Sequence, residues 1–105
     1  MLHIVRIPPY KSEPALTDIW ATNVFPLDDY KLLLEFSTGE KRIFDCKSLL
    51  YKPEFMSLLD KTKFNAVMVY DGDAAWPDEK IGLNGEALYY QSEPAHEALQ
   101  LLFPF

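Results

Sequence analysis

Residues 30–45 constrain the fold more than any other part of this 105-residue chain. Apolar side chains recur at every second position across residues 30–36, which is the period of a half-buried β-strand. The next four residues, Ser-Thr-Gly-Glu, contain Gly39, which can take the positive φ that a short connection needs. Residues 41–45 alternate again, so the segment predicts an antiparallel β-hairpin.

The rest of the chain holds several shorter strand patterns, separated by turn signals. Strands are expected at residues 3–7, 18–25, 66–70, 74–76 and 81–83. Pro26 is expected to end the second of these strands, because proline lacks a backbone donor. The Asp-Gly-Asp sequence at residues 71–73 predicts a tight turn between two strands.

Helices are expected in three places. Proline is favoured in the first turn of a helix, so Pro53 predicts a helix start. Apolar side chains then follow at i, i+3, i+4 and i+7 and form one stripe. These residues are Phe55, Leu58, Leu59 and Thr62. A short helical turn is expected after Asn84-Gly85, and a last helix is expected with Ser92 as its N-cap and Glu93 and Pro94 in its first turn.

This order of elements predicts an α+β fold in a single domain. We expect a mainly antiparallel, meandering β-sheet with one helix packed on a face and short C-terminal helices. Residues 1–17 are interpreted as an N-terminal arm that can hold a short strand. Residues 18–91 form the α+β core domain, and residues 92–105 form a C-terminal helix and apolar tail.

Composition narrows the class of protein. A net charge of −6 opposes binding to a phosphate backbone, so nucleic acid is an unfavoured partner. No apolar run approaches the roughly 20 residues needed to span a bilayer, and the first residues lack the apolar region of a signal peptide. A single cysteine cannot form a disulfide within the chain, so we expect a cytoplasmic protein without a membrane contact.

Charge is unevenly distributed along the chain. Residues 40–63 contain six bases and four acids, a net +2, which leaves −8 for the remainder. Residues 101–105, Leu-Leu-Phe-Pro-Phe, would be costly to leave in water, so they either fold back onto the core or dock on another subunit or partner. The expected interaction surface combines Lys41, Arg42, Lys61 and Lys63 with Leu101, Leu102, Phe103 and Phe105.

Two residue patterns resemble catalytic groups, but their surroundings in the sequence do not support a catalytic role. A thiol at Cys46 beside Lys47 could be activated, but no histidine is close in sequence. Asp28 and Asp29 are adjacent in a turn, where two carboxylates diverge instead of converging on a substrate. We therefore expect no catalytic residue and no cofactor.

Two further patterns resemble metal sites. Glu93 and His96 have the i, i+3 spacing of a di-iron ligand pair, but such a site needs a second pair and two more glutamates. The acidic residues around Gly72 lack the ligand spacing of a calcium loop. No metal site is therefore expected.

The pattern between residues 24 and 89 resembles the small bacterial family known as domain of unknown function 2442. The matching residues are Pro26, Leu27, Tyr30, Leu32, Phe36, Gly39, Glu40, Arg42, Phe44, Asp45, Phe55, Leu58, Phe64, Val67, Val69, Ala75, Trp76, Pro77, Leu88 and Tyr89. The resemblance implies a small α+β sheet domain with no established enzymatic activity. It also implies that family members are stand-alone units, N-terminal modules before a helix-turn-helix segment, or one half of a toxin–antitoxin-like pair.

The expected function is therefore a non-catalytic protein-interaction module that forms half of a two-protein regulatory pair, a homo-oligomer, or both. One alternative is a DNA-associated transcriptional regulator that lacks its own helix-turn-helix and acts through residues 40–63. Another alternative is a small-ligand binder or an enzyme of unknown chemistry.

Overall fold

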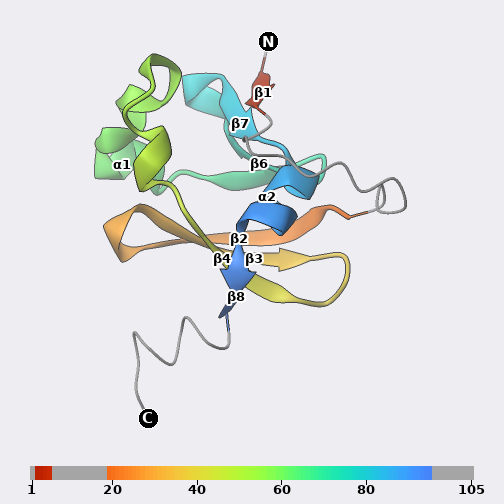
Figure 1. Ribbon diagram of the computed structural model, residues 1–105. Helices are drawn as coiled ribbons and strands as arrows, with labels where there is room; N and C mark the ends of the chain where they lie inside the picture. Colours follow the sequence, from red (N-terminus) through yellow and green to blue (C-terminus); the bar gives the residue numbers. More distant parts are fainter. Residues whose placement is uncertain (1, 6–18, 96–105) are drawn as a thin grey trace.

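The computed structural model describes residues 2–5 and 19–95, which form two four-stranded β-sheets with short helical segments beside them (Figure 1). Sheet A has the strand order β1-β7-β6-β5, and sheet B has the order β2-β3-β4-β8. The strands of sheet A are β1 His3–Val5, β5 Met68–Tyr70, β6 Asp73–Trp76 and β7 Ile81–Leu83. Those of sheet B are β2 Ala21–Leu27, β3 Lys31–Phe36, β4 Lys41–Asp45 and β8 Glu93–Pro94. The α+β class with mainly antiparallel pairing is confirmed, and the strands divide between two sheets.

The hairpin of β3 and β4 forms as its alternation predicts. Leu32, Leu34 and Phe36 are buried, while the residues between them face outward and are half-buried. Gly39 has a φ of 90°, which is the left-handed conformation that the turn requires.

Strand β2 differs from its prediction at both ends. It begins at Ala21 and continues through Pro26 to Leu27, so the prediction that Pro26 ends the strand is wrong. The physical reason is the position of β2 at the edge of sheet B, where a missing backbone donor removes no bond to a second neighbour.

Sheet A is built around the predicted tight turn. Asp71 and Gly72 have φ values of 49° and 83°, and this turn joins β5 to β6 in an antiparallel hairpin. At the opposite edge, β1 pairs in parallel with β7, and Asn84 N donates to the carbonyl oxygen of Val5 at 2.9 Å. The strand expected at residues 3–7 is confirmed over residues 3–5, and its last two residues lie outside the described part.

The two sheets enclose one hydrophobic core and meet along the edge strands β2 and β5 (Figure 1). The amide of Ala21 donates to the carbonyl oxygen of Gly72 at 2.8 Å across this junction. Trp76 is 1% exposed, and its indole Nε1 donates to the carbonyl oxygen of Phe64 at 2.8 Å. Phe36, Phe44 and Trp76 are all buried, as expected for core residues.

The helical region after Pro53 is divided in two. The helical segments are the 3₁₀ turns η1 Asp28–Tyr30, η2 Lys47–Leu49, η3 Pro53–Leu59 and η4 Pro77–Glu79, and the α-helices α1 Lys61–Phe64 and α2 Gly85–Gln91. Phe55 and Leu58 are buried as predicted, but Leu59 is 49% exposed. Asp60 causes the break, because its backbone is extended and its carboxylate accepts a hydrogen bond from Thr62 N.

Helix α2 begins as predicted, since the Asn84 side chain accepts a hydrogen bond from Ala87 N at 3.0 Å. The prediction of a helix capped by Ser92 is wrong for the residues that follow it directly. Glu93 and Pro94 form β8, which pairs with Arg42 and Ile43 of β4. Residues 96–105, including the predicted tail Leu101–Phe105, lie outside the described residues.

Candidate functional site

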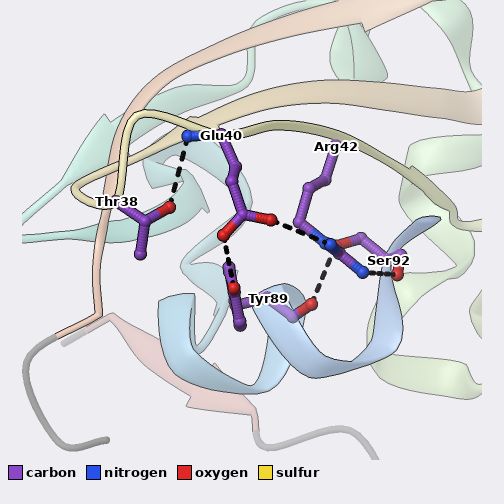
Figure 2. A network of polar contacts seen from close by, with 5 residues as sticks. All are labelled: Thr38, Glu40, Arg42, Tyr89 and Ser92. Atoms are coloured by element: carbon purple, nitrogen blue, oxygen red, sulfur yellow. Dashed lines mark hydrogen bonds and ion pairs between the residues drawn. The ribbon is translucent and has the colours of Figure 1, made fainter. Parts of the chain in front are cut away.

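A network of polar contacts joins the β3–β4 hairpin to α2 and β8 (Figure 2). At its centre Arg42 donates from Nε to Ser92 Oγ at 2.8 Å and from Nη2 to the Ser92 carbonyl oxygen. Its Nη1 pairs with Glu40 Oε2 at 3.2 Å, and its guanidinium lies 5.0 Å from the ring centroid of Tyr89. The Tyr89 hydroxyl donates to the other carboxylate oxygen of Glu40. We call Glu40, Arg42, Tyr89 and Ser92 the polar clasp.

The polar clasp has a structural explanation. All three guanidinium nitrogens of Arg42 are engaged, and its side chain is only 16% exposed. These bonds hold Ser92 beside β4, where Glu93 and Pro94 can pair as β8. Arg42 was predicted to lie on an interaction surface, but its hydrogen-bond donors are already occupied by Glu40 and Ser92 of the same chain.

The clasp also changes the acidity of its members. The hydrogen bond from Tyr89 is the main reason that the pKa of Glu40 lies below its ordinary value of 4.5, and Arg42 adds to the effect. The same bond raises the pKa of the Tyr89 hydroxyl above its ordinary value. A carboxylate whose pKa is lowered by folding stabilises the folded state above its unfolded pKa. This contribution is lost as the pH falls through the lower, folded value.

We therefore expect Glu40→Gln to reduce stability at pH 7 and to reduce the acid sensitivity of the protein. The difference in unfolding free energy between wild type and variant should be below about 1 kcal/mol, because Glu40 is half-exposed. It should shrink as the pH falls below 4.5. Urea unfolding at a series of pH values measures it, with Glu54→Gln as the exposed control. A difference that grows on acidification would contradict this account.

The predicted basic surface is not assembled in one place. Lys41 begins β4 and is exposed, whereas Lys61 and Lys63 lie on α1. The β3–β4 turn and α1 occupy opposite ends of the molecule in Figure 1. Lys61 Nζ lies 4.3 Å from the ring centroid of Tyr30, and Lys63 Nζ lies 3.9 Å from Glu79 Oε1.

The positive charge of Lys47, which also lies in this basic segment, is balanced by two nearby carboxylates. Its Nζ contacts Asp29 Oδ2 at 2.8 Å and Asp45 Oδ2 at 3.1 Å. The hydrogen bond with Asp29 raises the pKa of Lys47 and lowers that of Asp29. Asp29 is therefore an ion-pair partner here and is not poised to take up a proton.

Cys46, the candidate nucleophile, is a buried free cysteine. Its side chain is 2% exposed and belongs to the hydrophobic core. Burial raises the pKa of the thiol strongly, and the nearby Asp45 adds to this effect. The neutral thiol is a poor nucleophile, so the expected structural role fits the geometry.

We expect Cys46 to resist alkylation in the folded protein. Iodoacetamide should react at least about a hundredfold more slowly in native buffer than in denaturing urea, because reaction requires local opening and a thiolate. Mass spectrometry of the labelled fraction over time measures both rates. Equal rates in the two buffers would show that the thiol is accessible in the fold.

Among the described residues, no three His, Cys, Asp or Glu side chains gather closely enough to hold a metal ion. Glu93 is exposed on β8, and its predicted partner His96 lies outside the described part. A surface hollow of about 380 Å³ lies beside α1 and η4, and Lys63 and Glu79 in its wall face each other.

The outward face of sheet B carries a more distinctive pattern. Phe25, Leu33 and Ile43 lie directly opposite one another on three adjacent strands. Phe25 is 45% exposed, and Leu33 is half-buried. Ile43, although buried, lies outside the main core cluster. We call these three residues the apolar row.

Charged rows flank the apolar row on both sides. Glu35 and Lys41 are opposite each other on one side, and Lys31 and Asp45 on the other. Within the part of the chain that the structure describes, Lys31, Glu35 and Lys41 make no ion pair within 4 Å. An apolar stripe bordered by free charges is typical of a protein contact surface.

The fold and this face define a small α+β module built from two mainly antiparallel β-sheets. Residues 21–94 match the model of the protein family of unknown function DUF2442, which covers more than two thirds of the chain. The chain belongs to this family. No curated protein and no solved structure matches it. None of the described helices has the length and apolar character to cross a membrane.

Sequence reasoning missed the apolar row, although one signal was present. Leu32, Leu33 and Leu34 are consecutive, so both faces of β3 must be apolar at its centre. The contribution of Phe25 and Ile43 depends on the strand register, which alternation within one strand does not define.

Proposed function

We propose that this protein is a non-catalytic protein-interaction module that works through the outward face of sheet B. The apolar row carries the proposal, because three large apolar side chains lie together on the side of the sheet away from the core. Such surfaces in small proteins usually contact another protein. The cytoplasm is the proposed compartment, since it would keep the single cysteine reduced.

Two features support protein contact over duplex binding. The bases of residues 40–63 are dispersed, and Arg42, Lys47 and Lys63 each contact a carboxylate. The net charge of −6 also opposes a phosphate backbone. A regulatory partner, as in a toxin–antitoxin-like pair, would meet the same apolar row.

The test is recovery of a specific partner by the tagged full chain, either another protein or an untagged copy of itself. Leu33→Asp should abolish recovery, because a carboxylate would be buried at the contact. Tyr51→Asp is the matched control, since Tyr51 is 87% exposed and lies between η2 and η3, outside the strands of sheet B. Equal recovery by wild type and Leu33→Asp, or no specific partner for wild type, would count against the proposal.

A further inference from the structure

The central part of the outward face of sheet B, across β2, β3 and β4, is self-complementary in charge. Its nine central positions form three rows across β2, β3 and β4. The first row is Asn23, Glu35 and Lys41; the second is the apolar row; the third is Leu27, Lys31 and Asp45. The signs of the two charged residues therefore reverse between the first and third rows.

We propose that this face binds a second copy of the chain, forming a two-fold symmetric dimer with its axis along the apolar row. Rotation about this axis exchanges the two outer rows. Glu35 then faces Lys31 of the other copy, and Lys41 faces Asp45 of the other copy.

The apolar row packs against itself, which removes the exposed surface of Phe25 and Leu33 from water, while Ile43 is already buried. At the end of the row, Glu93 of β8 lies beside Ile43 and would meet Glu93 of the other copy.

The charges also select this axis over the alternative. Rotation about the direction of β3 would place Glu35 against Glu35 and Lys31 against Lys31, and such like-charge contacts oppose association. Lys31, Glu35 and Lys41 have no ion pair within 4 Å among the described residues, so these three are available for new partners. Asp45 would contact Lys41 of the other copy while it keeps its present ion pair with Lys47.

The size of the face determines the affinity expected for the dimer. Three strands spaced by about 4.8 Å and five residues of about 3.4 Å each give a small footprint. That is the scale of a weak, concentration-dependent dimer, well below the roughly 800 Å² per partner of a stable complex. The wild type should therefore be monomeric when dilute and dimeric when concentrated.

Sedimentation equilibrium of the full chain from about 5 to about 500 µM tests the proposal, since that range spans weak dimers. The wild-type mass should rise from 12.1 kDa toward twice that value. Glu35→Lys and Lys31→Glu should each raise the dissociation constant about tenfold or more, because each creates two like-charge contacts. Glu54→Lys and Lys52→Glu, on exposed residues of another region, should leave it unchanged.

The double variant E35K/K31E gives the most direct test of the proposed charge pairing. It recreates opposite charges between copies, so its dissociation constant should return to within about threefold of wild type. Within one copy it places like charges beside Lys41 and Asp45, so its monomer should be slightly less stable in urea. A double variant no tighter than the single variants would overturn the proposal, as would controls that weaken the dimer equally.

The inference rests on the proposed interaction role, but the two can fail separately. A wild type that remains monomeric overturns the dimer. If that monomer still recovers another protein, and Leu33→Asp loses it, the interaction role stands with a different partner.

Discussion

Replacing Trp76 by alanine should lower the free energy of unfolding by about 3–5 kcal/mol, more than any other single change considered for this fold. Trp76 is 1% exposed, and its ring centroid lies 5.9 Å from that of Phe64. Its removal would leave a cavity between the sheets and α1. It would also leave the Phe64 carbonyl oxygen without the indole donor, which adds to the loss.

Urea unfolding measured by circular dichroism tests this expectation, with Trp76→Phe as the companion variant. Phenylalanine keeps most of the buried ring and loses the hydrogen bond, so its cost should be about 1–3 kcal/mol. An alanine variant with a wild-type urea midpoint would show that Trp76 does not anchor the core as the structure describes.

Gly85→Ala should destabilise the protein by about 2–3 kcal/mol, although alanine is usually the better residue in a helix. Gly85 begins α2 against the turn between β5 and β6. A side-chain carbon there would collide with the carbonyl oxygen of Gly72 and lie 3.3 Å from Ala21 N. The Gly85 amide also donates to Asp73 Oδ1 at 2.7 Å, so moving the helix away would lengthen this bond.

Gly39→Ala is the matched comparison, because the two glycines are needed for different reasons. Gly39 has a positive φ but no atom within 4 Å of an added carbon. Its cost should be backbone strain alone, about 1 kcal/mol. Thermal unfolding of both variants ranks them, and a more stable Gly85→Ala protein would contradict the packing described at this junction.

The parts of the fold that the sequence predicted depend on short-range patterns. The β3–β4 hairpin follows from strict alternation and Gly39, and the β5–β6 turn from Asp71-Gly72. Helix α2 follows from the Asn84 cap. Each of these features is determined by residues that are close together in the sequence.

The errors share a different cause, because each depends on contacts between distant residues. Pro26 remains in a strand because β2 is at a sheet edge, a position that the strand order decides. Ser92 has the chemistry of an N-cap, but Arg42, 50 residues earlier, binds both its hydroxyl and its carbonyl oxygen. A local pattern cannot reveal such a competitor.

The candidate site was harder to predict for the same reason. The basic residues of residues 40–63 are close in sequence, yet the fold separates Lys41 from α1 and pairs most of the others with carboxylates. The apolar row, in contrast, joins Phe25, Leu33 and Ile43 through strand register. Surfaces made from several strands become visible only when the sheet is assembled.

The central claim, that the outward face of sheet B makes the functional contact, is tested most directly by amide chemical shifts of the full chain. Spectra recorded across a concentration series should show changes at Phe25, Leu33 and Ile43 that saturate together. The exposed residues Tyr51 and Met56, which lie elsewhere, should not change. Changes centred on Tyr51 and Met56, or none at the apolar row even with a recovered protein partner present, would contradict the claim.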